Sequence, residues 1–288
     1  MIKKKTHILC FMLILCSVCQ AQKLSIKPYV LYHQPMSKQY EPIFHDIYYR
    51  DYTKNFPIDY IGEASPSSKD FRIATGLEYG FTIDYTFRNH LGFELGLGYF
   101  NSQVNQEKAK ELFQFFSRKS YSLNNFEYYN SYLTDWNYHS IAIRPLFSYA
   151  VIAGKSAFIA KIGPVIHYAS VSTNAFLGID KVSSCRFANR LNWGYSTALE
   201  YNYRLSTHLS AALELGLEQY NYTPLRATVE YDEKVVPGGK KDEIHYVNKI
   251  VNEPSSFFYP SQNKSLKSSV SFNNVYFGIG IKYNLWEK

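Results

Sequence analysis

The sequence predicts an all-β fold, a barrel of eight antiparallel strands connected up and down. Eight segments alternate apolar side chains with polar or small ones at a period of two, the pattern of a strand with one apolar face. The connections between them alternate strictly between short and long. Barrels with tight turns at one end and long loops at the other show this asymmetry.

The predicted strands suit a membrane better than a soluble sandwich. They are residues 24–33, 71–87, 91–101, 138–151, 157–170, 191–205, 209–222 and 270–285. Several exceed the roughly 5–6 residues of an ordinary strand and reach the roughly 9–11 that a tilted membrane strand needs. Short turns are expected at 88–90, 154–156 and 206–208, and long loops at 34–70, 102–137, 171–190 and 223–269. The sequence therefore predicts a transmembrane barrel with short periplasmic turns and long extracellular loops.

One face of each predicted strand is almost wholly apolar. In residues 91–101, for example, Leu91, Phe93, Leu95 and Leu97 alternate with glycines and Glu94. We expect the apolar face to point outward. Aromatic residues gather near the strand ends, which suits girdles at the two membrane interfaces; they include Tyr85, Phe87, Tyr99, Tyr149, Tyr168, Tyr201, Tyr203 and Tyr283.

The opposite face carries small and charged residues, which we expect inside the barrel. An eight-stranded barrel is only wide enough for its own side chains, and unpaired charges there are costly. The sequence therefore predicts a salt-bridged core that closes the lumen, with an ion or proton path as the alternative. The predicted interior charge cluster comprises Lys27, Arg72, Glu78, Asp84, Glu94, Arg144, Lys161, Glu200, Arg204, Glu214, Glu218 and Lys282.

Residues 1–21 have the features of a secretory signal peptide. Lys3–Lys5 form a positive end, an apolar stretch runs over 8–18, and small residues precede a cleavage site after Ala21. The mature barrel domain would then be residues 22–288. Lipidation of Cys19 is an alternative, although Val18 is not the small residue that usually precedes a lipidated cysteine. Cleavage after Ala21 leaves Cys185 as the one cysteine, which excludes an internal disulfide.

Charge and candidate chemistry point away from nucleic acid and from catalysis. The net charge is +7, and Lys3–Lys5 supply three of those charges with no acid before residue 22, so 7 − 3 = +4 remains. No catalytic, cofactor-binding or metal-binding residues are predicted, and the chain is not expected to be an enzyme. His139 and Ser140 are adjacent and so face opposite sides of a strand. His167 faces inward, where we expect a hydrogen-bonding role.

The long connections hold two further predicted features. A helix-like stretch runs over residues 106–118. Gly238-Gly239 predicts a turn between strand-like runs at 227–233 and 243–251, hence a hairpin above the barrel. Both the first and second long loops are rich in Tyr and Phe. These rings either pack together as a lid or present a surface to an extracellular ligand or protein partner.

The final strand carries a resemblance to a known family. In residues 278–285, Gly280 is followed at spacings of three and five by Tyr283 and Leu285, which resembles the C-terminal strand by which outer-membrane barrels are recognised. The chain then continues to Lys288, whereas many members end at an aromatic residue. Over residues 22–285 the chain is similar to the small outer-membrane β-barrels.

This resemblance implies export to the bacterial outer membrane, insertion by the barrel-insertion machinery, and contact with outer-membrane lipid and lipopolysaccharide. Members of the family serve different purposes, so function does not follow from the fold. We expect a structural or binding role through the outer loops. The alternatives are a narrow, porin-like solute channel or a lipid-modifying hydrolase or acyltransferase.

Overall fold

The computed structural model describes residues 23–36, 58–60, 72–87, 90–104, 114–122, 125–177, 180–224, 226–231, 241–247, 264–266 and 270–287. The predicted signal peptide, including Cys19, lies outside these residues, and so do most of the first long loop and the turn at Gly238-Gly239. No helix among the described residues is long and apolar enough to cross a membrane.

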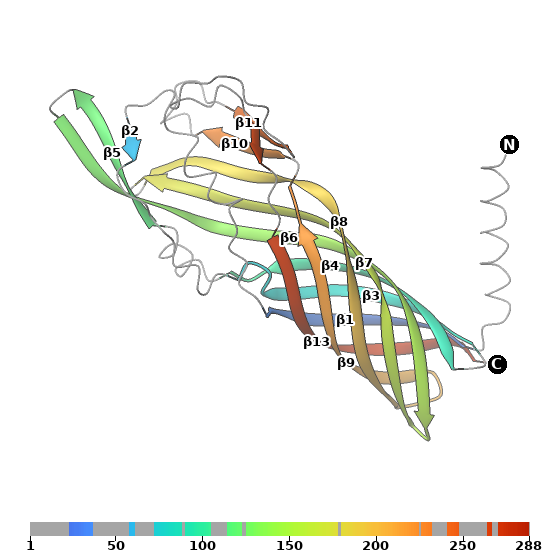
Figure 1. Ribbon diagram of the computed structural model, residues 1–288. Helices are drawn as coiled ribbons and strands as arrows, with labels where there is room; N and C mark the ends of the chain where they lie inside the picture. The colour runs from blue at the N-terminus through green and yellow to red at the C-terminus, as the bar shows by residue number, and fades with distance from the viewer. Residues whose placement is uncertain are drawn as a thin grey trace, which may run out of the picture.

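Eight strands close into a ring in which every pair of neighbours is antiparallel, and this confirms the predicted fold class (Figure 1). Strands β13 and β1 complete the ring, with Val30 opposite Ile279. In order around the barrel the strands are β1 (Lys23–Pro35), β3 (Gly76–Thr86), β4 (Leu91–Ser102), β6 (Asn125–Ala153), β7 (Ser156–Leu177), β8 (Asp180–Arg204), β9 (Leu209–Tyr222) and β13 (Val270–Glu287).

Three of these strands continue far beyond the ring and form an open sheet. Strand β6 has 29 residues and β8 has 25. Beyond the barrel, β6 pairs with β5 (Gln114–Ser122) and β8 with β10 (Arg226–Tyr231). β11 (Lys241–Val247) and the short strands β2 (Ile58–Tyr60) and β12 (Lys264–Leu266) complete it. We call this part the sheet extension; it leaves the barrel at the end opposite the short turns (Figure 1).

The connections correct two predictions and confirm a third. Much of the predicted long loops at 102–137 and 171–190 is strand, because β6 begins at Asn125, β7 continues to Leu177 and β8 begins at Asp180. Residues 114–118 of the predicted helix-like stretch belong to strand β5, which pairs with β6, so the helix is wrong there. Pairing with a long neighbouring strand overrides a local helical preference. Residues 105–113 lie outside the described part. β10 and β11 form the predicted hairpin, with Ala227 opposite Ile244. In the short turn between β6 and β7, Gly154 has φ 63°, which favours glycine.

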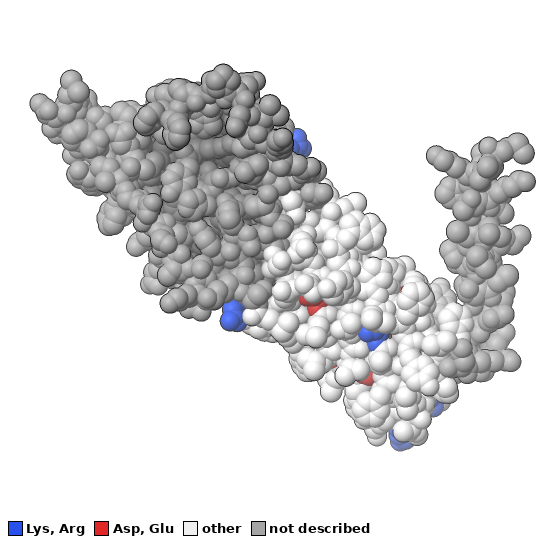
Figure 2. All heavy atoms as spheres, viewed as in Figure 1, with Lys and Arg blue, Asp and Glu red and all other residues white. Residues whose placement is uncertain are grey.

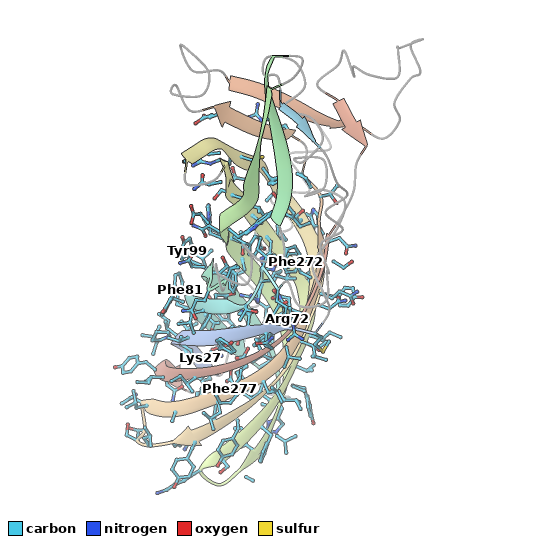
Figure 3. All side chains as sticks on the ribbon, turned by 90° about the vertical axis from the view of Figure 1, so that its left-hand side faces the viewer. Lys27, Arg72, Phe81, Tyr99, Phe272 and Phe277 are labelled. Carbon is cyan, nitrogen blue, oxygen red and sulfur yellow. The ribbon has the colours of Figure 1, made fainter. Side chains whose placement is uncertain are left out.

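The faces of the barrel strands follow the predicted alternation. On β9, Leu213, Leu215 and Leu217 are exposed, whereas Glu214 and Glu218 are buried. Figure 2 shows the described barrel wall with few charged atoms on the visible side. In the side-chain view, Phe81 and Tyr99 lie on the outer side and Lys27 lies within the ring (Figure 3). The hydrophobic surface is therefore outside and the charged surface inside.

Candidate functional site

The barrel interior contains a charged layer toward the short turns, centred on two lysines. The Nζ of Lys161 donates to Glu94 Oε2 at 2.5 Å, Glu200 Oε2 at 2.5 Å and Glu214 Oε2 at 3.0 Å. Lys27 Nζ donates to Glu214 Oε2 at 2.7 Å and to Glu200, and lies 3.8 Å from Glu94 Oε2. Two cations thus hold the same three carboxylates, each of which comes from a different strand.

The register explains why these lysines are needed. Glu200 lies directly opposite Glu214 on β8 and β9, and Asp84 lies opposite Glu94 on β3 and β4. Like charges in such positions repel each other. The lysines from β1 and β7 reach between Glu200 and Glu214, and both also approach Glu94. Lys282 Nζ adds a contact to Asp84 Oδ2 at 3.2 Å.

A second charged layer, nearer the sheet extension, is centred on Arg144. The guanidinium of Arg144 donates through both Nη atoms to Glu78, with Nη2 2.7 Å from Oε2, and through Nε to Glu218 Oε2 at 2.7 Å. Fork geometry of this kind is among the strongest charge-assisted arrangements. Two buried histidines also face these carboxylates: His33 Nε2 lies 3.2 Å from Glu78 Oε2 and His167 Nε2 lies 2.9 Å from Glu218 Oε1.

An aromatic layer follows, which the sequence analysis did not identify. Phe272 stacks on both Tyr138 and Tyr220, with ring centroids 5.0 Å apart in each pair. The Tyr138 and Tyr220 hydroxyls lie 2.5 Å apart, and Tyr220 also stacks on His167. Phe272 lies above Lys27 along the barrel (Figure 3). These three aromatic residues occupy inward-facing positions in the alternation of β6, β9 and β13. That alternation would have predicted that they lie inside the barrel.

Ten of the twelve residues predicted for the interior lie in the two charged layers, and two do not. Arg72 is exposed and precedes β3, which begins at Gly76, so the alternation does not extend to it. Arg204 is exposed at the last position of β8, where its side chain reaches the rim of the barrel. The other ten are at most 8% exposed; they are Lys27, Glu78, Asp84, Glu94, Arg144, Lys161, Glu200, Glu214, Glu218 and Lys282.

The cationic and anionic side chains of this interior are unequal in number. Among the described inward residues, four cationic side chains face six carboxylates. His33 and His167 each lie at ion-pair distance from one carboxylate. Both histidines therefore belong to the Arg144 layer, where they add contacts to Glu78 and Glu218.

Ser140, His167 and Glu218 are connected in the same order as the serine, histidine and acid of a hydrolytic triad. Ser140 Oγ lies 3.3 Å from His167 Nδ1, and the other ring nitrogen lies 2.9 Å from Glu218 Oε1. A working nucleophile must reach its substrate. Ser140 is 1% exposed, and the His167 ring is covered by Tyr220. The geometry is that of a hydrogen-bonded core. Among the described residues, no group of three or more His, Cys, Asp or Glu side chains is arranged to hold a metal ion.

The closed ring, apolar outside and charged inside, has the architecture of the small outer-membrane β-barrels. No family model and no curated protein matches the sequence. Among solved structures, the chain is similar to the outer membrane protein OprG from Pseudomonas aeruginosa, at 12% identity and TM-score 0.44, covering 93% of this chain and 97% of that one. It is also similar to a major outer membrane protein from Thermus thermophilus, at 10% identity and TM-score 0.44, covering 91% and 99%. A third similar structure is the outer membrane protease OmpT from Escherichia coli, at 8% identity and TM-score 0.28, covering 92% and 94%.

Proposed function

We propose that this protein is a non-conducting outer-membrane barrel that holds the sheet extension above the membrane for a structural or binding role. The single observation that supports this most is the filled interior. Lys27 and Lys161 link carboxylates from three strands across the barrel. Arg144 links two further carboxylates, those of Glu78 and Glu218. Above them the aromatic layer occupies the same cross-section. Each layer joins opposite walls of the ring.

The outer wall supports the membrane location. Leu199, Trp193 and Phe147 are about two thirds exposed, at 66%, 65% and 65%. A soluble protein rarely exposes a continuous apolar surface of this kind. On β9 the outward residues are apolar from Leu209 to Leu217, which matches the roughly 9–11 residues of a tilted membrane strand. This belt suits the hydrocarbon layer of a bilayer.

The upper border of the belt is sharp and lies at the same register on neighbouring strands. Outward residues change from apolar to polar at Asn101 and His139, which are direct cross-strand partners on β4 and β6. Gln219 and Asn273 mark the same change on β9 and β13. A polar border of this kind is expected where strands leave the hydrocarbon layer. The sheet extension begins above it, and by analogy with barrels of this architecture it would face the exterior.

Two measurements on one preparation test this proposal. Protein folded into planar bilayers is expected to give no discrete conductance steps, because the ion-paired layers leave no continuous water path. Heat-modifiable gel migration of the same sample must show that the barrel is folded. Regular single-channel steps from pure, folded protein would favour the narrow solute channel instead.

The lipid-modifying alternative has its own test, because the contacts among Ser140, His167 and Glu218 give it a specific candidate nucleophile. Folded protein incubated with labelled phospholipid or lipid A is expected to release no product. Release that disappears in Ser140→Ala, with folding retained, would replace the proposal with an enzymatic function.

A further inference from the structure

The sheet extension has a polar hollow of about 360 Å³, formed by residues of four neighbouring strands, β6, β7, β8 and β10. It lies apart from the charged layers inside the barrel. Its lining is hydroxylated, amide or charged apart from one cysteine, and consists of Asp135, Ser172, Thr173, Asn174, Ser184, Cys185, Arg186, Thr228 and Glu230.

The register shows that the hollow is on the outer face of the wall. Ser172, Arg186 and Thr228 form one cross-strand row, and Asn174, Ser184 and Glu230 form the next. Ser172 and Asn174 have the same parity on β7 as Tyr168, whose side chain is exposed on the outside of the barrel. The buried partners of the opposite parity, Val171 and Phe187, point to the inner face. A ligand in the hollow therefore approaches from beside the protein.

A local distortion turns an acidic side chain toward this hollow. Asp135 has φ 56°, a left-handed conformation that is uncommon for a residue other than glycine. The β6–β7 register shifts between Thr134 and Asn137, so Asp135 lies in a bulge. Its Oδ2 accepts a hydrogen bond of 2.8 Å from Asn174 Nδ2. Bulges redirect side chains, and backbone strain of this kind is concentrated at functional sites.

The chemistry of the lining fits a saccharide that carries an anionic group. Hydroxyls of Ser172, Ser184 and Thr228, together with the carboxylates of Asp135 and Glu230, suit the hydroxyl groups of sugars. The exposed guanidinium of Arg186 is the one cation in the lining, and its planar fork suits a phosphate or carboxylate. The lining offers no aromatic or aliphatic surface for an acyl chain.

The position of the hollow relates it to the membrane surface. Ser172 and Asn174 follow Tyr168, the last outward apolar residue below the polar border on β7, by four and six residues. At about 3.3 Å per residue this is roughly 13–20 Å along the strand. Barrel strands are tilted by about 35–45°, so the rise above Tyr168 is roughly 10–15 Å, the level expected for saccharides attached to lipids of the outer leaflet. We propose that the hollow binds the phosphorylated core saccharide of an outer-leaflet glycolipid. The proposal rests on the outer-membrane location proposed above.

The test measures binding of three probes to folded, detergent-solubilised protein: a lipopolysaccharide with a phosphorylated core, its released core oligosaccharide, and lipid A without core sugars. Arg186→Ala is expected to weaken binding of the first two about tenfold, because one charge-assisted hydrogen-bonding group is lost. Arg204→Ala, which removes the same type of side chain at the opposite end of the barrel, is the matched control and is expected to bind as the unchanged protein does. Glu230→Gln is expected to weaken binding less. Heat-modifiable migration must be the same for all variants.

Equal affinity of Arg186→Ala and the unchanged protein for the core-bearing probes would overturn the site. Binding of lipid A, which has its own phosphorylated disaccharide but no core sugars, as strong as that of the full glycolipid would also overturn it, because the core saccharide would then add nothing. Binding of the released oligosaccharide without binding of the glycolipid would overturn the lipid-borne source. The proposed outer-membrane location is tested separately by cell fractionation. Recovery of the mature protein in the soluble periplasmic fraction would contradict that location.

Discussion

The two ends of the barrel interior are filled in different ways. Toward the short turns, Lys27 and Lys161 hold carboxylates from several strands. Toward the sheet extension, Tyr138, Phe272 and Tyr220 stack in one layer. Charges in a weakly polar interior stabilise one another as a connected set, since removing one partner leaves another charge buried and uncompensated. Stacked rings contribute area and contacts that are lost one residue at a time. The two ends should therefore respond differently to single substitutions.

The largest expected effect is at the charged end. Lys161→Ala removes the cation that contacts Glu94, Glu200 and Glu214, and is expected to destabilise the folded barrel by about 3–5 kcal/mol. Urea unfolding in lipid vesicles measures this. Lys155→Ala, an exposed lysine in the neighbouring turn, is the control and should change stability by less than about 0.5 kcal/mol. Similar values for the two variants would show that the ion pairs do not stabilise the barrel.

A smaller effect on stability is expected on the outer wall, where the comparison is between two positions at different depths in the membrane. Leu215→Arg places a charge near the middle of the apolar belt and should cost about 2–4 kcal/mol. Gln219→Arg lies two outward positions further along β9, past the polar border, and should cost about 0–1 kcal/mol. The same unfolding measurement compares them. Equal costs would contradict the position of the border.

The smallest effect is expected in the aromatic layer. Tyr138→Phe keeps the stack on Phe272 but removes the hydroxyl that lies 2.5 Å from the Tyr220 hydroxyl. A loss of about 1 kcal/mol is expected, because one buried hydrogen bond is removed. A loss as large as that for Lys161→Ala would show that the aromatic end depends on its polar atoms as strongly as the charged end does.

The sequence predicted which residues form the wall of the barrel, but not which charged residues pair inside it. Period-two alternation predicted strand β9 with the bounds that the structure has, 209–222. One face of that strand must be apolar toward the outside and the other polar toward the interior, so its pattern is clear. Parity also separated Glu214 and Glu218 from their leucine neighbours. Which cation meets which carboxylate depends on the stagger of the strands around the ring. Lys27 meets Glu200 across 173 positions of sequence, a distance over which no local pattern operates.

The sheet extension was the least predictable part. Above the polar border an outward residue no longer needs to be apolar, so the alternation fades at Ser172, Thr173 and Asn174 although β7 continues to Leu177. Lys119 and its neighbours pair with β6 in strand β5, which local composition did not indicate. The hollow at Asp135 was also missed, because a bulge changes side-chain direction without leaving a sequence signal.

Accessibility of spin labels along β9 tests the central claim, an apolar belt in lipid around a charged interior, most directly. Single cysteines replace Leu213, Leu215, Leu217, Gln219 and Asn221 in a Cys185→Ala background, and the labelled protein is folded into vesicles. Contact with oxygen should be highest at positions 213 and 215, and contact with a water-soluble nickel complex should rise at 219 and 221. High nickel contact at 213 and 215 would contradict the account, since those positions would then face water.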